Sequence, residues 1–306
     1  MSLIVTGTVG IDTVHTPTDK AECVLGGSCV YFAAAASFFT HVRMVAAVGG
    51  DFDASYHDVL ARFPNVCIEG LHVRPSSKTF AWGGRYSENW NDRETLFTEL
   101  GVLVEEPPPI PESYKDSRFI FLANSHPAVQ LQALHAFPKR IFSVADTMNL
   151  WIDSEPDALR DLLQAIDGLI INDEEARQLT GRRNVISAGR QIIDTMGPMF
   201  AVIKKGEHGC TLVHDEGAAM LPAFPVERVV DPTGAGDSFA GGMMGHLAAA
   251  HTRDMNVSMS SVRQALAHGT VIASFNIESF SLDRLAGLTK EEVAQRYTEF
   301  QGMVRV

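Results

Sequence analysis

A carboxylate stands at the end of a glycine-rich turn in the segment Asp231-Pro232-Thr233-Gly234-Ala235-Gly236-Asp237. The small and apolar residues from Ser238 to Ala250 predict a helix, whose start directs unpaired N–H groups and the positive end of its dipole at a ligand. A carboxylate would repel an anion there unless it handled a proton. We therefore interpret the segment as a phosphoryl-transfer site. The backbone from Gly234 through Ala235 to Gly236 would stabilise the transferred group, and Asp237 would take the proton of the attacking hydroxyl.

The residues alone leave a simpler interpretation open, in which the glycines only make a tight turn and Asp237 caps the helix. The full string D-P-T-G-A-G-D-S-F-A-G-G resembles the C-terminal signature of the ribokinase family, also called the PfkB carbohydrate kinases. No Walker A string is present in the chain. The resemblance covers most of the chain. It implies ATP-dependent transfer of the γ-phosphoryl group to a hydroxyl of a sugar or sugar-like molecule, with Mg²⁺ as a cofactor.

A second glycine pair, Gly26-Gly27, precedes a predicted Ala-rich helix. Paired glycines let the backbone approach a ligand closely, although such a pair is more often a plain turn. In the ribokinase family the corresponding glycines contact the acceptor, and an aspartate at the position of Asp12 binds its hydroxyls. The resemblance therefore implies a substrate site of Asp12, Gly26 and Gly27. Tyr31 replaces an asparagine of the family pattern, and its ring either packs against a furanose or nucleobase or belongs to the core.

Asn172 and Glu175 follow a predicted strand in an N-x-x-E pattern. The pattern resembles the family motif that orders magnesium and its waters around the nucleotide phosphates, and Mg²⁺ prefers oxygen ligands and retains several waters. Asn172 is equally suited to cap a helix and Glu175 to occupy the third position of a capping box. The two roles are compatible, and we expect both residues beside the nucleotide, with magnesium held through water.

Lys204 ends a predicted strand, and Gly206 and Gly209 form the turn that follows it. In the family the equivalent turn lines the ATP pocket. The resemblance therefore implies that these three residues contact the nucleotide, with Lys204 neutralising phosphate charge. A solvated surface turn is the alternative.

Asp231 and Thr233 fall where relatives bind a monovalent cation, so K⁺ is a candidate second cofactor.

Two further predicted strand ends carry polar residues, 124–126 after one strand and Asp146 with Asn149 after the next. Ligands of parallel sheets bind beyond the carboxyl ends of the strands, so these side chains should open onto the same cleft.

Positioning these residues requires a sheet whose strand ends meet, and the pattern of the chain predicts one. Short apolar runs alternate with helical patterns, which indicates an α/β fold with a mostly parallel sheet covered by helices on both faces, ribokinase-like by resemblance. The predicted strands are 3–9, 42–48, 119–123, 140–145, 168–171 and 200–204, with a hairpin continuing to 211–213. The predicted helices are 28–39, 52–62, 127–137, 156–165 and 174–179.

Residues 12–25 and 66–104 break this rhythm. The second segment is rich in Thr, Arg, aromatic residues and glycine, with alternating patterns on both sides of a predicted turn at Gly83-Gly84. It predicts an antiparallel insertion that would form, with 12–25, a small sheet over the site. In the ribokinase family such a sheet is a lid and often a dimer interface. We therefore expect a single kinase domain over residues 1–306, with this lid and a homodimer formed through it.

Composition excludes several classes of partner. The chain has 25 basic and 37 acidic residues in 306, a formal net charge of −12, which disfavours binding to nucleic acids and to anionic membranes. The four cysteines form no C-x-x-C pair and suggest reduced thiols in a cytoplasmic protein. The sequence shows no signal peptide and no stretch apolar enough to span a bilayer.

Three other functions have some support in the sequence. A nucleoside kinase on the same scaffold is favoured by Tyr31 and by the aromatic residues Phe80, Trp82 and Tyr86 of the predicted lid. A non-catalytic sugar-binding module would keep the pocket without the chemistry, and the intact Asp237 argues against it. A nicotinamide-dependent dehydrogenase is disfavoured because no G-x-G-x-x-G string follows the first predicted strand.

Overall fold

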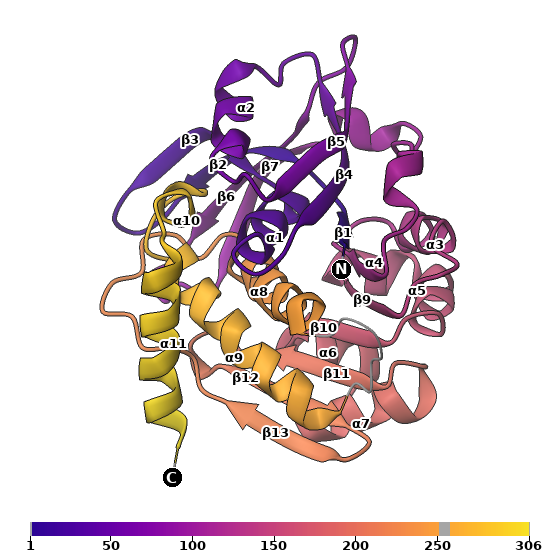
Figure 1. Cartoon of the computed structure of the whole chain (residues 1–306), viewed down its shortest axis with the longest axis vertical. Coiled ribbons are helices and arrows are strands. Elements are labelled where there is room, and N and C mark those ends of the chain that lie inside the picture. The colour runs from indigo at the N-terminus through magenta and orange to yellow at the C-terminus, as the bar shows by residue number, and fades with distance from the viewer. Residues whose placement is uncertain (1, 251–257, 306) are drawn as a thin grey trace.

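The computed structural model describes residues 2–250 and 258–305 and contains a nine-stranded sheet in the order β13-β12-β11-β10-β9-β8-β1-β4-β5. Every neighbouring pair from β11 to β5 is parallel, and β12 and β13 continue the sheet antiparallel beyond β11 (Figure 1). The strands are β1 (Leu3–Thr6), β4 (Val42–Gly49), β5 (Val66–Arg74), β8 (Phe119–Leu122), β9 (Phe142–Asp146), β10 (Gly168–Asn172), β11 (Phe200–Lys204), β12 (Cys210–His214) and β13 (Gly217–Leu221).

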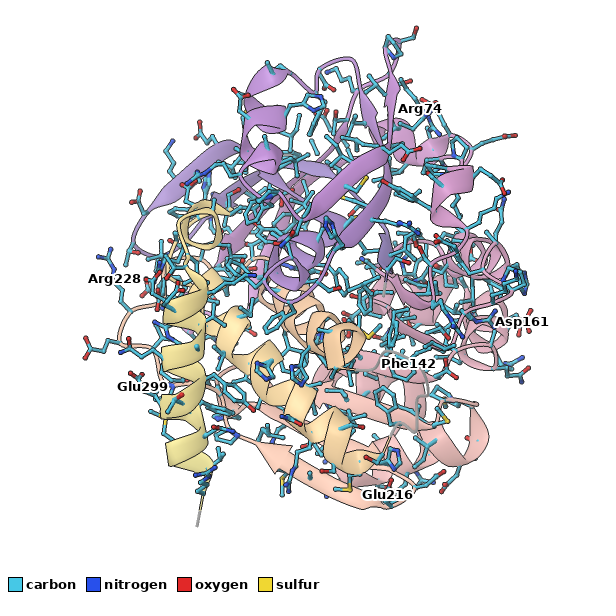
Figure 2. All side chains as sticks on the ribbon, in the orientation of Figure 1. Arg74, Phe142, Asp161, Glu216, Arg228 and Glu299 are labelled. Atoms are coloured by element: carbon cyan, nitrogen blue, oxygen red, sulfur yellow. The ribbon has the colours of Figure 1, made fainter. Side chains whose placement is uncertain are left out.

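Helices cover both faces of this sheet and enclose a hydrophobic core on each side. One core packs α1 (Ser28–Ala36), α8 (Ala235–Ala250), α9 (Met259–Asn276) and α11 (Lys290–Val304) against the sheet, with the short α2 (Ala54–Ala61) and α10 (Asp283–Ala286) beside them. It includes Phe142, whose ring centroid lies 6.0 Å from that of Phe200 (Figure 2). The other core packs α3 (Pro127–His135), α4 (Asn149–Ser154), α5 (Pro156–Leu163), α6 (Asp173–Thr180) and α7 (Val185–Thr195).

The helices α1, α8 and α9 approach each other closely because glycines face the contacts. A Cβ on Gly241 of α8 would collide with the carbonyl oxygen of Phe32 in α1, and one on Gly245 would lie 2.9 Å from the Cα of Ala36. On another side of α8, a Cβ on Gly242 would lie 2.9 Å from the Cα of Gly269 in α9. The three helices therefore pack backbone against backbone, which leaves them little freedom to slide.

A second, four-stranded sheet has the order β3-β2-β6-β7 and forms the lid. Its strands are β2 (Gly10–His15), β3 (Lys20–Gly26), β6 (Phe80–Tyr86) and β7 (Arg93–Glu99). The outer pairs are antiparallel and the central pair β2–β6 is parallel. In register pairs Asp12 lies opposite Trp82, and Tyr86 lies opposite Arg93. Alternation along the strands therefore places these four side chains on one face of the lid.

Two details of the predicted lid are wrong. Residues 66–74 form β5, which pairs in parallel with β4 at the edge of the main sheet, so the lid is narrower than the predicted 66–104. Gly83 and Gly84 lie inside β6 at a register shift, and the chain reverses between Ser87 and Asp92. A Cβ on Gly84 would strike the Trp82 ring. These glycines accommodate aromatic neighbours and a bulge, a common role for glycine within a strand.

The remaining predicted strands and helices are present, with ends that shift by a few residues. The first strand stops at Thr6 instead of Val9 because Gly7 begins the turn toward the lid, where a Cβ would touch both Ala123 and Ser28. Three short 3₁₀ helices, η1 (Gly101–Val104), η2 (Glu112–Tyr114) and η3 (Gly206–His208), complete the described elements. Within the described ranges, none of the helices combines the length and apolar character needed to cross a membrane.

Candidate phosphoryl-transfer site

The glycine-rich turn leads into α8, as predicted. Gly234 adopts φ +74°, a left-handed conformation that favours glycine, and its carbonyl accepts a hydrogen bond from the Ser238 N–H at 2.8 Å. Buried Asn276 of α9 fixes the turn, because its Nδ2 donates to the Thr233 carbonyl at 2.8 Å and its Oδ1 lies 3.1 Å from Ser238 Oγ. The Ala235 N–H donates to the Pro232 carbonyl at 3.2 Å, whereas the N–H groups of Gly236 and Asp237, in the first turn, have no acceptor within their own helix. They can therefore face an anion.

Asp237 and Lys204 meet at this helix start. A Cβ on Gly236 would lie 2.8 Å from Lys204 Nζ, so the ammonium group at the end of β11 lies against the first turn of α8. Burial raises the pKa of Asp237 to about 6, while the charges of Lys204 and Arg93 act in the opposite direction. A carboxylate with this pKa is largely ionised at neutral pH and can accept a proton. The site thus combines a base, an ammonium group and helix N–H groups.

Asp12, Gly26 and Gly27 form one cluster, as predicted. The Asp12 carboxylate lies directly against Gly26, where any Cβ would overlap it, and it accepts a backbone hydrogen bond from Gly27. Gly27 adopts φ +99° immediately before α1, and a Cβ there would lie 2.5 Å from the Thr8 carbonyl oxygen. Burial, followed by the charges of Asp231 and Asp237, raises the pKa of Asp12 to about 7. The Asp12 and Asp237 carboxylates are therefore close enough for the charge of Asp237 to affect the titration of Asp12.

Tyr31 is placed differently from the stacking prediction. Its ring packs against Gly234, beneath the turn that leads into α8, and the residue is 1% exposed. The ring has no free face for a sugar or a base, so the alternative that it belongs to the core holds. Its hydroxyl is buried without a hydrogen-bond partner, and burial together with Asp231 and Asp12 raises the pKa of the phenol. Tyr31 thus links α1 to the glycine-rich turn that leads into α8.

Asp231 and Thr233 lie on the loop before this turn. Asp231 Oδ1 accepts from the Thr233 N–H at 2.8 Å, whereas Oδ2 is buried without a partner. Burial raises the pKa of Asp231 to about 6. A buried, unpartnered carboxylate oxygen fits a cation ligand. Thr233 Oγ1 lies 3.2 Å from the Tyr86 hydroxyl, which joins the lid to this loop.

Asn172 and Glu175 form the capping box of α6, in which Asn172 Oδ1 accepts from Glu175 N at 2.7 Å and Glu175 Oε2 accepts from Asn172 N at 2.8 Å. Burial raises the pKa of Glu175, and the charge of Lys204 opposes that rise. Capping therefore does not separate Glu175 from the site. In the part of the chain that the structure describes, no group of three His, Cys, Asp or Glu side chains could hold a metal ion by itself. This donor set fits a magnesium ion that is bound mainly by phosphate and water.

Gly206 and Gly209 form the turn between β11 and β12, with Lys205 N donating to the Gly209 carbonyl at 2.7 Å. A Cβ on Gly209 would overlap the carbonyl oxygen of Leu221 at the end of β13. Gly206 faces the lid, where a Cβ would lie 3.1 Å from Asn91 Oδ1. Of the three residues predicted here, Lys204 is the one that the structure brings to Asp237.

Two charged residues outside the predicted catalytic and ligand-binding sets join the site: Asp146, which was predicted only to open onto the cleft, and Arg93, which was not predicted. Asp146, at the end of β9, is 6% exposed with an unpartnered Oδ1, and burial followed by the charge of Asp237 raises its pKa. Its strand-end position was the available signal. Arg93 of β7 stacks over the Trp82 ring at 4.9 Å, and its charge acts on Asp12, Glu175 and Asp237. No sequence pattern distinguishes this arginine from others in the lid.

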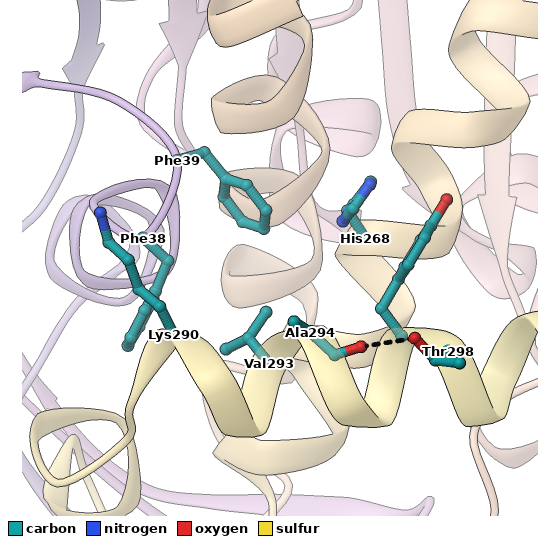
Figure 3. A pocket seen from close by; sticks show the side chains of 8 residues that line it. Phe38, Phe39, His268, Lys290, Val293, Ala294 and Thr298 are labelled. Carbon is teal, nitrogen blue, oxygen red and sulfur yellow. Dashed lines mark hydrogen bonds between the residues drawn. The ribbon is translucent and has the colours of Figure 1, made fainter.

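A pocket of about 310 Å³ between α9 and α11 lies apart from this site (Figure 3). It is lined by Phe38 and Phe39, which follow the end of α1 opposite Gly27, and by His268, whose ring stacks on Tyr297 at 3.9 Å. Lys290 lies at its rim. The phosphoryl-transfer residues are therefore not among its lining residues.

A doubly covered parallel sheet, a lid and a buried carboxylate at a glycine-rich helix start are the features expected of a phosphotransferase with an alcohol acceptor. Residues 12–285 match the model of the pfkB family of carbohydrate kinases, and the chain belongs to that family. The chain is 30% identical over 250 residues to a cytidine kinase from Thermococcus kodakarensis, covering 80% of this chain and 87% of that protein. It is 24% identical over 205 residues to a nucleoside kinase from Methanothermobacter thermautotrophicus, covering 66% of this chain and 64% of that protein.

Solved structures confirm the ribokinase-like fold. A nucleoside kinase from Burkholderia thailandensis in complex with inosine matches with a TM-score of 0.75 and 18% identity over 98% of this chain and 99% of that one. A ribokinase from Cryptococcus neoformans in complex with ADP matches with a TM-score of 0.77 and 19% identity over 96% and 99% of the two chains. The predicted fold class is thereby confirmed, and the family match together with the cytidine kinase relative confirms the predicted kinase class.

Proposed function

We propose that this protein is a nucleoside kinase that transfers the γ-phosphoryl group of ATP to a ribose hydroxyl. The convergence of Asp237, the α8 start and Lys204 next to the Asp12–Gly27 cluster carries the proposal. This arrangement supplies a base and positive charge on one side and a hydroxyl-binding carboxylate on the other. The 30% identity to a cytidine kinase over 80% of the chain favours a nucleoside over a simple sugar.

In this proposal the substrate hydroxyls bind Asp12 and the backbone at Gly26 and Gly27. A carboxylate can accept hydrogen bonds from two neighbouring hydroxyls, which orients the ribose for attack. Asp237 takes the proton from the attacking hydroxyl. The backbone turn from Gly234 to Gly236 surrounds the transferred group, and the N–H groups of Gly236 and Asp237 bind its peripheral oxygens, over which the negative charge is spread.

The donor side would be formed by residues at the neighbouring strand ends. Lys204 would bind nucleotide phosphate, while Glu175, Asn172 and Asp146 would hold magnesium chiefly through water. The magnesium ion would supply positive charge to the phosphate oxygens. The unpartnered Oδ2 of Asp231 supports a monovalent cation beside Thr233. Gly206 and Gly209 are proposed to shape the nucleotide side of the cleft.

Arg93 would complete the positive surroundings from the lid. Its charge acts on three carboxylates of the site, and among the described residues no carboxylate lies within ion-pair distance of its guanidinium. An arginine can bind phosphate oxygens with two parallel hydrogen bonds. Lid closure would therefore bring a phosphate ligand to the site and exclude water from it.

A substrate panel tests the proposed function. Purified protein with MgATP would be assayed for ADP release with cytidine, uridine, adenosine, inosine, ribose, fructose 6-phosphate and 2-keto-3-deoxygluconate. We expect the highest kcat/KM with a nucleoside. Preference for a free sugar would identify a sugar kinase on the same fold. Binding without ADP release from any acceptor would favour the non-catalytic module and contradict the proposal.

The lid is also the proposed homodimer interface. β7 is an edge strand whose residues are all exposed, and Leu96 and Phe97 are 36% and 39% exposed. A free, partly apolar strand edge is suited to pairing with another chain. Light scattering of the purified protein would test this.

All four cysteines are free thiols, which supports the proposed cytoplasmic location.

A further inference from the structure

A cluster of Asn124, His126 and Trp151 at the strand ends has no role in the phosphoryl transfer described above. Trp151 Nε1 donates to Asn124 Oδ1 at 3.0 Å, and the Trp151 ring lies 5.2 Å from the ring of His126. His126 Nδ1 accepts from the Ala128 N–H, and its Nε2 lies 3.5 Å from a carboxylate oxygen of Glu155. These contacts fix the orientation of the two aromatic rings.

The cluster borders the acceptor site. Ala123 precedes Asn124 and donates its N–H to the Thr6 carbonyl at 2.8 Å. A Cβ added to Gly7 would contact both Ala123 and Ser28, so these two residues lie close together. Ser28 directly follows Gly27 of the proposed acceptor site. On the other side, Gln130 Nε2 donates to the carbonyls of Ala123 and Asp146, which holds the end of β8 beside that of β9. The end of β8, which Asn124 follows, thus lies between the start of α1 and the end of β9 that carries Asp146.

The Asn124 amide presents a donor with a weak partner. An indole N–H can only donate, so the atom that it contacts is the amide oxygen, and this fixes which way Asn124 is turned. Its Nδ2 then points to Met148 Sδ at 3.2 Å, and a thioether sulfur is a weak acceptor. A better acceptor on a ligand would replace that contact favourably. Asn124, His126 and Trp151 are all partly exposed.

From these contacts we infer that Asn124 and Trp151 form the nucleobase subsite, an inference that rests on the proposed nucleoside kinase function. Asn124 Nδ2 donates to a carbonyl oxygen or unprotonated ring nitrogen of the base. The Trp151 ring contributes a flat aromatic surface, and His126 is a positioning residue for that ring. Phe80 and Trp82 lie on the same face of the lid as Asp12, so the lid also turns aromatic surface toward the acceptor.

The inference is tested by comparing nucleosides with ribose, which has no base. Asn124→Asp keeps the acceptor for the Trp151 indole but replaces the amide donor with a carboxylate oxygen. Trp151→Ala removes the aromatic surface, and Trp151→Phe restores most of it. Leu150→Ala, in the same helix with Leu150 51% exposed, is the matched control. Kinetics with cytidine, uridine, adenosine and ribose would be combined with calorimetric binding of the same compounds.

We expect Asn124→Asp and Trp151→Ala to lower kcat/KM and binding affinity for the preferred nucleoside by about 10- to 100-fold, since a lost base contact or stacking partner has effects of this order. The values for ribose and those of Leu150→Ala should stay within about two-fold of wild type. Equal losses for nucleoside and ribose, or no loss for either, would overturn the base subsite while leaving the nucleoside kinase intact. A wild-type protein that phosphorylates no nucleoside would overturn both.

Discussion

At the scale of single residues, the site depends on carboxylates that the fold buries near one another. Asp12 and Asp231 are 4% and 1% exposed, and both have raised pKa values because burial disfavours their charged forms. Such unfavourable burial of carboxylates is typical of functional sites, where binding of a substrate or a cation then provides partners for the buried groups. The positive charges of Lys204 and Arg93 reduce the free-energy cost of burying the ionised Asp237 carboxylate.

Asp237→Asn should lower kcat by about 10²- to 10⁴-fold because the amide cannot accept the hydroxyl proton. Nucleotide affinity and Tm should change little, since the substitution conserves shape. In the wild-type protein kcat/KM should fall as pH drops through about 6, where the raised pKa of Asp237 predicts that the carboxylate becomes protonated. Stopped-time ADP assays from pH 5 to 8 would measure both effects. A variant with wild-type kcat would contradict the assigned role.

Asp12→Asn should stabilise the free protein while impairing acceptor binding. The folded pKa of about 7 lies above the ordinary value of 3.8, so the stability contributed by the protonated group is complete below pH 4 and is lost as pH rises toward 7. Asparagine is neutral at every pH in this range. The variant should therefore show no gain in Tm at pH 4 and a gain of a few degrees at pH 8, since each kcal/mol of unfolding free energy raises Tm by about 2–4 °C.

Asp53→Asn is the control for this prediction. Asp53 is an exposed helix cap whose pKa is lowered by hydrogen bonds from Ser55, so the sign of its pH effect is opposite. Asparagine is also a good cap, and no gain in Tm is expected at pH 8. Thermal unfolding of both variants across this pH range would decide the matter. Equal shifts for the two variants would argue against a buried, strained Asp12.

At the scale of secondary-structure elements, the lid and the helix starts supply different parts of the site. The lid carries Asp12, Tyr86 and Arg93 on one face, and Tyr86 meets Thr233 of the main domain at 3.2 Å. The loop at the tip of the lid meets the β11–β12 turn through Asn91 and Glu207 at 3.5 Å. The lid therefore contacts both the loop that precedes α8, at Thr233, and the β11–β12 turn on the proposed nucleotide side.

Arg93→Ala should lower kcat by about 10²-fold, an effect comparable to the loss of a donor that stabilises transition-state charge. Arg93→Lys should recover part of that loss, because it restores charge without the guanidinium geometry. Arg85→Ala is the matched control from the adjacent lid strand. Arg85 is 55% exposed and lies 3.6 Å from Glu94, a surface pair of small energetic consequence. If the alanine variants at both positions behave alike, Arg93 has no special role.

Gly241→Ala should destabilise the protein by about 1–3 kcal/mol, the usual range for overpacking, because the new methyl group meets the Phe32 backbone. Gly302→Ala offers the opposite case within an exposed part of α11, where no heavy atom lies within 4 Å of the added Cβ. Alanine is a better helix former than glycine, so this control should be neutral or stabilising by up to about 1 kcal/mol. Urea unfolding would measure both, and similar values would contradict close packing of α1 and α8.

The sequence predicted most elements of the main sheet because their apolar runs are distinct and their order alternates. It also pointed to the Asp237 turn and, through the family resemblance, to the Gly26-Gly27 pair, and the structure places the two near each other through Asp12. The assignment of β5 failed because an exposed edge strand such as 66–74 has the same alternation as a lid strand. The burial of Tyr31 and the reach of Arg93 depend on contacts between segments far apart in the chain, which local patterns do not contain.

At the scale of the whole molecule, the net charge of −12 opposes the approach of a nucleotide. In the proposed site, attraction would act at short range, at Lys204, Arg93 and the start of α8. Long-range repulsion of this kind slows association and is screened by salt, because the Debye length falls from about 30 Å at 0.01 M to about 8 Å at 0.15 M.

Raising ionic strength from 0.01 to 0.15 M should therefore increase kcat/KM for MgATP by on the order of two-fold. The uncharged acceptor provides an internal control, since its kcat/KM at saturating MgATP should stay constant. Initial rates in KCl and in tetramethylammonium chloride would separate screening from a specific effect of K⁺ at Asp231. A decline in kcat/KM for MgATP with added salt would show that local attraction dominates the encounter.

The backbone-to-backbone packing of α1, α8 and α9 has a consequence for selectivity. Gly27 and Gly234 precede two helices whose backbones pack closely together, so in the proposed mechanism the main chain would set the distance from the bound acceptor to the phosphorus. Which hydroxyl is phosphorylated would then be a property of the scaffold. Which molecule carries that hydroxyl is decided by side chains around it, and the two traits can diverge independently as the substrate range of such an enzyme changes.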